Sequence, residues 1–182
     1  MENTIATIVV IFYMLKNSMK KNLELRMYGM VPYNLSPIQQ GIQFGHSVVE
    51  YGQRVRYHES QGFEHPLIID YNTWANEWKT FIILNGGTTN LNENKLGSLN
   101  QHLSTLLNMG VFCAPFYEPD LGDQLTAISF IIDERVFNRE KYPDFIEPTL
   151  DDWIDKFDDT EDNIQRILAL REFLHPKNFK LA

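Results

Sequence analysis

The middle of the chain alternates between patterns typical of buried strands and patterns typical of amphipathic helices. Residues 80–84 form a short, continuously apolar run, which suits a strand buried on both faces. A leucine-rich helical pattern follows over residues 99–109, and two further apolar runs cover residues 111–116 and 126–132. A strand, a helix and a strand in so short a stretch predict a βαβ unit with a parallel pair of strands. The fold class is therefore α/β.

A further strand and helix are expected on the N-terminal side of this unit. Residues 23–33 predict a strand ended by Pro32, and Ser36-Pro37 predicts a helix start, with Ser as the N-cap and Pro at the first helical position. That helix is expected to reach about Gly52, and a shorter helix is expected over residues 71–78. Together these segments predict a small, mixed four-stranded sheet covered by helices.

Length and composition are those of an ordinary globular protein. The chain has 182 residues, of which 43% are hydrophobic and 22% charged, so fibrous and disordered classes are excluded. A net charge of −8 argues against binding nucleic acid through the overall field of the protein, although a local basic site remains open. Cys113 is the single cysteine, so no internal disulfide can form and a cytoplasmic location is expected.

The first 21 residues form an N-terminal extension that differs from the rest. An apolar run over residues 4–15 is followed by Lys16, Lys20 and Lys21. The run is too short to span a membrane comfortably, and a secretory signal carries its positive charge before the apolar part. Three interpretations stay open: a translation start placed too early, an added structural element, or a membrane anchor. No stable membrane association is expected.

The fold-bearing domain is expected over residues 22–148, and residues 149–182 form a C-terminal helical extension whose last helix is expected to stop at His175-Pro176. An acidic stretch separates the two helices expected there. It is interpreted as a solvated loop and helix start, and the alternative is a mimic of nucleic acid or a surface that docks a partner. The acidic residues are Asp155, Asp158, Asp159, Glu161 and Asp162.

The helix that starts at Ser36-Pro37 carries the first candidate site. Gln39, Gln43, His46 and Glu50 follow helical spacing and share one face, which can hydrogen-bond a ligand. The alternative is a helix with one solvated side. The adjacent face is expected to pack on the sheet through Ile38, Ile42, Gly45 and Val49.

Two further candidate sites follow predicted strands. Asn85-Gly86-Gly87 comes directly after residues 80–84, where backbone N–H groups can meet an anion, and an ordinary turn is the alternative. Glu118 and Asp120 follow the next strand and can act as a base or as hydrogen-bond acceptors, whereas a nonfunctional acidic turn is the alternative.

No metal or cofactor is predicted. The five histidines show no metal-ligand spacing with carboxylates or with Cys113, which itself lies in an apolar strand as inert packing.

Residues Gln43-Phe44-Gly45-His46-Ser47 resemble the Gln-x-x-His-Ala signature on the first helix of the type 2 peptidyl-tRNA hydrolase family. The resemblance covers roughly residues 23 to 135 and extends to the order of the elements. Segments 36–39 and 117–121 are similar to those of phage-encoded members of this fold, so a viral source is inferred. The resemblance implies the family fold and hydrolysis, without a metal, of the ester that joins a peptide to the 3′ ribose of tRNA.

The chain departs from this family at positions that matter for catalysis. The resemblance implies a Lys four residues before the signature Gln, and an Asp and a Thr in the loop after the third strand. Here Gln39 occupies the Lys position, Glu118 occupies the Asp position, and the Thr has no clear counterpart. Loss of a charged donor costs about 2–4 kcal/mol of transition-state stabilisation, so efficient hydrolysis is not expected.

Three functions follow from these observations. The first is a phage accessory protein that binds a nucleotide-like molecule, a tRNA 3′ end or a host factor, with weakened or no hydrolase activity. The second is an active peptidyl-tRNA hydrolase in which His46, Glu118 and Asp120 form a rearranged catalytic set. The third is a host-protein interaction module that uses its acidic surface; a homodimer also stays open. The ligand-binding residues are expected to be Gln39, Gln43, His46, Asn85, Gly86, Gly87 and Glu118.

Overall fold

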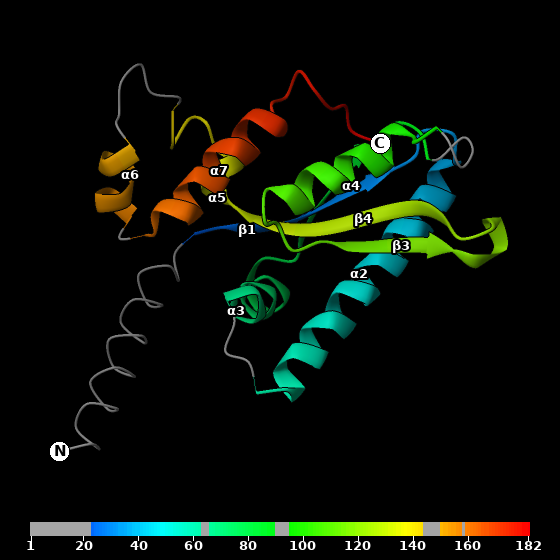
Figure 1. Ribbon diagram of the computed structural model, residues 1–182, viewed down its shortest axis with the longest axis horizontal. Helices are drawn as coiled ribbons and strands as arrows, with labels where there is room; N and C mark the ends of the chain where they lie inside the picture. Colours follow the sequence, from blue (N-terminus) through cyan, green and yellow to red (C-terminus); the bar gives the residue numbers. More distant parts are fainter. Residues whose placement is uncertain (1–22, 63–65, 90–94, 144–149, 158) are drawn as a thin grey trace.

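The computed structural model describes residues 23–62, 66–89, 95–143, 150–157 and 159–182 (Figure 1). The expected N-terminal extension therefore lies outside the described residues. No described helix is both long enough and apolar enough to cross a membrane. The strands are β1 (Leu25–Val31), β2 (Thr80–Asn85), β3 (Ala114–Glu118) and β4 (Gln124–Asp133), and the helices are α2 (Pro37–Ser60), α3 (Pro66–Thr73), a π-helical turn (Trp74–Trp78), α4 (Ser98–Asn108), a 3₁₀ turn (Pro119–Leu121), α5 (Glu134–Phe137), α6 (Leu150–Phe157) and α7 (Glu161–Phe173).

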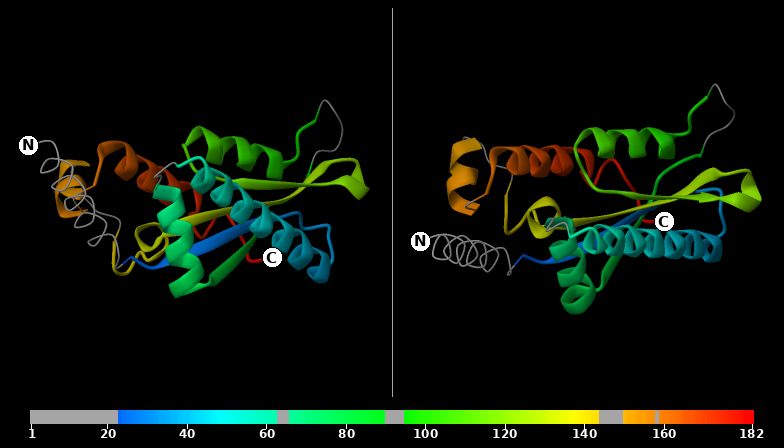
Figure 2. Two further views of the ribbon diagram at one scale, coloured as in Figure 1. Left: turned by 90° about the horizontal axis from the view of Figure 1, so that it is seen from below. Right: turned by 60° about the horizontal axis from the view of Figure 1, so that its bottom comes forward.

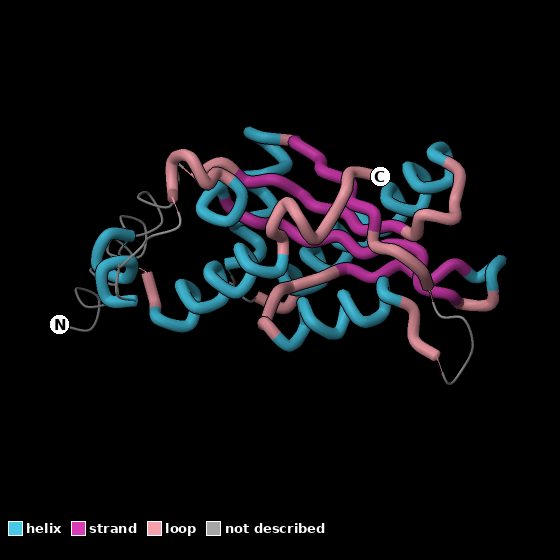
Figure 3. Tube along the Cα trace, turned by 90° about the horizontal axis from the view of Figure 1, so that it is seen from above, coloured by secondary structure: helices cyan, strands magenta, loops and turns pink. Residues whose placement is uncertain are grey.

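The expected α/β class and the mixed four-stranded sheet are confirmed. The strand order is β2-β1-β4-β3, with β1 parallel to β2 and with β4 antiparallel to both of its neighbours. The expected parallel pairing of the strands on either side of α4 is wrong, because β1 and β4 lie between β2 and β3. The parallel neighbours are instead β1 and β2, which α2 and α3 connect. Figure 3 shows the strands side by side.

Helices cover both faces of the sheet, which gives three layers (Figure 2). Side chains of β1 alternate between these layers. Met27 and Val31 join the core under α2 and α3. Tyr28 and Met30 join the core under α4, α6 and α7. Burial of side chains of this size contributes about 1.5–3 kcal/mol each, so this alternation holds β1 at the centre of the fold.

Helix α2 begins where the sequence predicts and continues past the expected end at Gly52. Ser36 accepts from the Gln39 backbone N–H at 3.4 Å, and the Gln39 side-chain oxygen accepts from the Ser36 N–H at 3.1 Å, which completes a capping box. Pro37 occupies the first turn. The long helix crosses the sheet beside β3 and β4 (Figure 1).

The face that α2 presents to the sheet differs from the expected one. Ile38, Ile42 and Val49 are 77%, 51% and 58% exposed, so the expectation that they pack on the sheet is wrong. Compared with the expected orientation, α2 is rotated about its own axis. The reason is that β3 and β4 offer both hydrogen-bonding partners and apolar contacts to the face of α2 that is buried against them. Those buried residues are Gln43, Phe44, Ser47, Tyr51, Gly52 and Val55.

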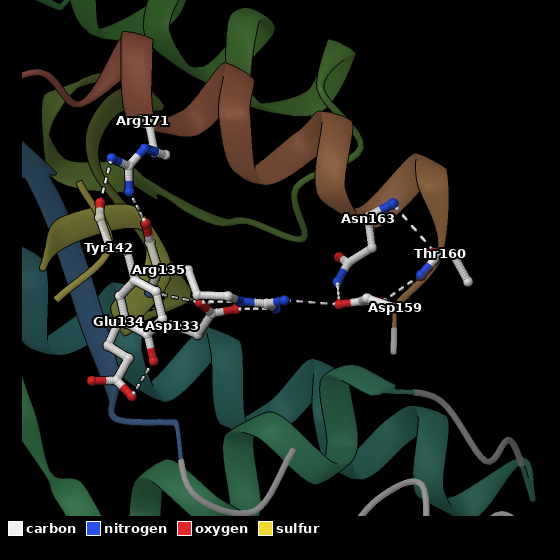
Figure 4. Close-up of polar contacts among 8 residues, drawn as sticks. All are labelled: Asp133, Glu134, Arg135, Tyr142, Asp159, Thr160, Asn163 and Arg171. Atoms are coloured by element: carbon white, nitrogen blue, oxygen red, sulfur yellow. Dashed lines mark hydrogen bonds and ion pairs between the residues drawn. The ribbon is translucent and has the colours of Figure 1, made fainter. Parts of the chain in front are cut away.

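Buried arginines join the C-terminal helices to the sheet (Figure 4). Arg135 donates from Nε and Nη2 to the two carboxylate oxygens of Asp133 at 3.0 and 2.7 Å, and from Nη1 to Asp159 at 3.0 Å. Arg171 on α7 donates to the carbonyls of Arg135 and Tyr142. The interpretation of Asp159 as part of a solvated loop is therefore wrong, since its side chain is 3% exposed and its carboxylate pairs with a buried cation.

Candidate functional site

Three side chains from three elements meet where β3 ends. Gln43 of α2 donates from Nε2 to Oε2 of Glu118 at 2.5 Å. Thr126 of β4 donates its hydroxyl to Oε1 of the same glutamine at 2.6 Å. Gln43 and Thr126 are 8% and 1% exposed, whereas Glu118 is half-buried. The amide of Gln43 thus links an inaccessible hydroxyl to a carboxylate that solvent can reach.

An irregularity in the β3–β4 pairing brings Thr126 to this side of the sheet. Phe116 pairs with Ala127 while Tyr117 pairs with Leu125, so Thr126 is an extra residue in its strand. Leu125 joins the core under α4 and α7, and Ala127 joins the core under α2. A bulge at Thr126 re-aims its side chain toward α2, as bulges commonly do beside functional sites.

A second pair of contacts fixes α2 one turn further along. Ser47 donates its hydroxyl to the carbonyl of Ala114 at 2.5 Å, and Ser129 donates to the carbonyl of Ser47 at 3.0 Å. Both serines are fully buried. Because these bonds set the position of the helix along β3, they also set the position of Gln43 against Glu118.

His46 lies on the exposed flank of α2, one turn after Gln43. Its ring stacks on Phe116, with a centroid separation of 4.7 Å and an interplanar angle of 19°. Phe116 is half-buried and His46 is exposed. The flat imidazole ring of His46 therefore rests on Phe116, which lies two residues before Glu118 in β3.

The chemistry of this cluster is that of a hydrogen-bonding site with one acidic group. Gln43 uses one donor on Glu118, and Oε1 of Glu118 accepts no hydrogen bond from the described residues. That oxygen can accept from a hydroxyl or an amine of a ligand. No Lys or Arg donates to Gln43, Glu118 or Thr126 in the described part of the chain.

Gln39 is not gathered into the cluster. Its side-chain oxygen accepts from the N–H and from the hydroxyl of Ser36, at 3.1 and 2.9 Å, within the cap of α2. The residue is exposed one turn before Gln43. Sequence spacing placed it on the same helix face, whereas the capping bonds direct its side chain to the helix start.

The turn Asn85-Gly86-Gly87 follows β2, and Glu118 ends β3, so the two lie at opposite edges of the sheet. Three strand spacings, roughly 14 Å, separate β2 from β3. Asn85 accepts from the Gly87 N–H at 2.9 Å, and Gly86 N–H donates to the Val31 carbonyl at 2.8 Å. These groups hold the turn together, and the structure does not bring them to Gln43 and Glu118.

Asp120 is exposed in the 3₁₀ turn after Glu118, and none of its contacts joins it to Gln43 or His46.

Two contributors to the site were not singled out from the sequence, namely Thr126 and Phe116. A hydroxyl residue in an otherwise apolar strand needs a buried partner, so Thr126 carried a usable signal. Phe116 carried none, because an aromatic residue in a strand is ordinary core.

The remaining candidate groups do not form a reactive centre. Among the described residues, no group of three or more His, Cys, Asp or Glu side chains is placed to hold a metal ion. Cys113 is 3% exposed, and burial raises the pKa of its thiol to about 12. A thiol of this pKa stays protonated at neutral pH and is a poor nucleophile.

Comparisons of this chain with protein-family models, with curated proteins and with solved structures found no match.

Proposed function

We propose that the protein has the fold of type 2 peptidyl-tRNA hydrolases and uses the flank between α2 and β3 to bind a nucleoside-type ligand, with little or no hydrolase activity. The shared chemistry is that of a ribose and a base, as found in a free nucleotide or at an RNA 3′ end. The observation that carries the proposal is the bond from Gln43 to Glu118, backed by Thr126 and flanked by the His46 ring.

The order of the elements supports this resemblance. A strand (β1) precedes the helix that bears Gln43 and His46, and β2, the leucine-rich α4, β3 and β4 follow. Gln43 is the signature glutamine in the resemblance, and it is the residue that links α2 to both β3 and β4. The motif therefore coincides with the contact on which the site depends.

The side chains suit a nucleoside better than a polyphosphate. The exposed face of the His46 ring offers a surface for a base, and stacking of a base on an aromatic ring is worth about 1–3 kcal/mol. Oε1 of Glu118 can accept from ribose hydroxyls or from an exocyclic amine. A half-buried carboxylate with no cation bonded to it would repel a group with several negative charges.

The same geometry argues against efficient ester hydrolysis. In the resemblance the position of Gln39 belongs to a lysine that supplies a positive charge, whereas here a neutral amide caps the helix. Glu118 carries its carboxylate one methylene further out than an aspartate, and misplacement of a catalytic group by about 1 Å can cost about 100-fold in rate.

Equilibrium binding of adenosine, AMP and a CCA trinucleotide tests the proposal. We expect binding of at least one of these probes, weakened tenfold or more in His46→Ala and in Glu118→Gln. Asp123→Asn is the matched control, because this exposed acidic residue lies in the same hairpin and Asn also tolerates its positive φ of 55°. No binding of any probe at millimolar concentration would refute the site.

Incubation with peptidyl-tRNA separates binding from catalysis. We expect turnover at least 100-fold below that of an active family enzyme assayed in parallel. Rapid turnover that disappears in Glu118→Gln would replace the binding function with a hydrolase that uses rearranged residues.

A further inference from the structure

Residues 180–182 lie along the edge of β2, which is an outer strand of the sheet. The N–H of Asn85 donates to the carbonyl of Lys180 at 2.9 Å, and the N–H of Ala182 donates to the carbonyl of Ile83 at 3.0 Å. The two segments run antiparallel. The chain itself therefore shows how an extended segment pairs with this edge.

Residues 180–182 are held on the edge of β2 by weak contacts. Leu181 is 73% exposed, and the residues on either side of it are exposed as well. The segment is anchored by the residue before it, Phe179, whose ring meets those of His102 and Phe173 edge-on at centroid distances of 5.0 and 5.2 Å. Exposed residues held by few hydrogen bonds open readily, so residues 180–182 can leave the edge while Phe179 stays packed.

The rest of the β2 edge is open. Main-chain groups of successive strand residues point to opposite sides, so those of Phe81 point outward, as those of Ile83 and Asn85 do. Among the described residues, no group bonds the N–H or the carbonyl of Phe81, or the N–H of Ile83. Phe81 is 48% exposed, and Trp78, three residues earlier, is 37% exposed. The open part of the edge thus combines free main-chain groups with exposed aromatic side chains.

Strand β2 lacks the features that usually prevent a further strand from pairing with an edge. Such edges carry a charged residue, a proline or a bulge. The sequence of β2 is TFIILN, which has no charged residue and no proline. Its pairing with β1 continues without a register shift from Thr80 to Asn85. A straight, uncharged edge with free main-chain groups is suited to strand addition by an extended peptide.

We propose that the edge of β2 is a docking surface for an extended peptide of a partner protein. The peptide adds antiparallel in the place that residues 180–182 hold and continues along Phe81. The peptide residue opposite Phe81 exchanges two main-chain hydrogen bonds with it, and an apolar side chain there packs beside the Phe81 ring. Residues 180–182 act as an internal competitor for the same edge, so a partner must bind more strongly than they do.

Fluorescence anisotropy with the labelled peptide Lys-Leu-Ala-Thr-Val-Thr tests the docking surface on the full chain. Its first three residues copy residues 180–182, and its valine lies opposite Phe81 in the same register. We expect a dissociation constant of about 10–100 μM. N-methylation of the valine removes the N–H that donates to the carbonyl of Phe81 and should weaken binding at least tenfold. N-methylation of the threonine before it is the matched control, because that N–H points away from β2.

A disulfide that fixes residues 180–182 on the edge tests the competition. Leu84 and Leu181 are directly opposite each other, between the two hydrogen bonds. The Cα atoms of such a pair lie about 4.5 Å apart, which a disulfide can span. The double variant Leu84→Cys/Leu181→Cys should bind the peptide when reduced and at least tenfold more weakly when oxidised. Cys113 is buried and does not compete.

Failure of the unmodified peptide to bind the full chain at millimolar concentration would overturn the proposal. Equal binding of the two N-methylated peptides, or of the oxidised and reduced double variant, would overturn it as well. The comparison of peptides uses the unaltered chain, so it decides the question even where the double variant does not fold. Because no change here alters Gln43, His46 or Glu118, the result is independent of nucleoside binding.

Discussion

Gly29 in β1 lies so close to the ring of Phe44 in α2 that a Cβ at Gly29 would come within 2.3 Å of two ring carbons. Phe44 is buried, and its ring meets that of Phe81 edge-on at a centroid distance of 5.4 Å. The missing side chain at Gly29 therefore sets how closely α2 approaches the sheet. Gln43 is the preceding residue of α2, so the same contact sets the depth at which this glutamine meets Thr126.

Substitution of Gly29 by alanine should destabilise the protein. Glycine to alanine in a strand with ordinary φ usually stabilises a fold by restricting the unfolded chain. Here the added methyl would enter the space of the Phe44 ring, and overpacking of this kind costs about 1–3 kcal/mol. Urea denaturation followed by tryptophan fluorescence would measure the loss in the free energy of unfolding.

The control for this prediction is Gly41→Ala, measured in the same way. Its added Cβ meets open space, so alanine should raise the free energy of unfolding by about 0.5–1 kcal/mol. If Gly29→Ala raised the free energy of unfolding as Gly41→Ala is expected to do, the close approach of Gly29 and Phe44 would be wrong.

Thr126→Val should lower both stability and ligand affinity. Valine keeps the shape of the side chain but removes the hydroxyl that bonds Gln43 at 2.6 Å, which leaves a buried amide oxygen without its donor. The expected loss in the free energy of unfolding is about 1–3 kcal/mol by urea denaturation. Binding of the nucleoside probes should weaken as well, because Gln43 is then free to turn away from Glu118.

Thr105→Val is the matched control for Thr126→Val. The hydroxyl of Thr105 bonds the carbonyl of Gln101 on the exposed side of α4 at 2.9 Å. Its removal should change stability by less than about 0.5 kcal/mol and leave probe binding unchanged. Equal losses in the two variants would show that burial of the Thr126 hydroxyl does not matter.

The start of α2 could be predicted from the sequence, but the face that packs on the sheet could not. Ser36 and Pro37 carry capping information within one turn, so the helix start is local. Periodicity predicted an apolar stripe through Ile42 and Val49 but could not say what faced the sheet. The answer depends on Ala114 and Thr126, which lie 67 and 83 residues from their partners on α2.

The order of the strands could not be predicted from local sequence patterns, for the same reason. The strand, helix and strand from β2 to β3 read as neighbours, and their common direction is correct. The crossover through α4 nevertheless passes over β1 and β4, whose pairing is decided by contacts distant in the sequence. Glu118 could thus be placed at a strand end, whereas its separation from Asn85 could not be foreseen.

Arg135→Met should destabilise the attachment of the C-terminal helices. This buried guanidinium bonds Asp133 and Asp159, and burial alone would lower its pKa, but the two carboxylates outweigh burial and raise it. Removal of one partner of a buried ion pair typically costs about 3–5 kcal/mol, because the remaining charges lose their compensation.

Combining Arg135→Met with Asp159→Asn tests this explanation. In urea denaturation, the double variant should lose less stability than the sum of the two single variants, because the second change removes a carboxylate already left without its cation. Strict additivity would mean that the two side chains are not coupled.

The stability of the protein should fall above pH 9 through the Cys113 thiol. Burial raises the pKa of this thiol from its ordinary value of 9.0 to about 12, and the nearby Arg54 opposes the change only in part. Between these values the unfolded chain releases the proton while the native chain keeps it, so a rise in pH favours unfolding. The expected loss is about 1.4 kcal/mol between pH 8 and pH 10.

Urea denaturation at pH 8, 9 and 10 would measure this dependence, with Cys113→Ala as the control. The alanine variant is less stable at every pH because a buried group is lost, but it should lack the part of the slope that the thiol contributes. Burial also raises the pKa of Tyr51 well above its ordinary value of 10.0, so tyrosine ionisation adds to the slope mainly at higher pH. Parallel curves for the two proteins up to pH 10 would show that the thiol ionises alike in the native and unfolded chains, and would contradict its burial in the core under α4.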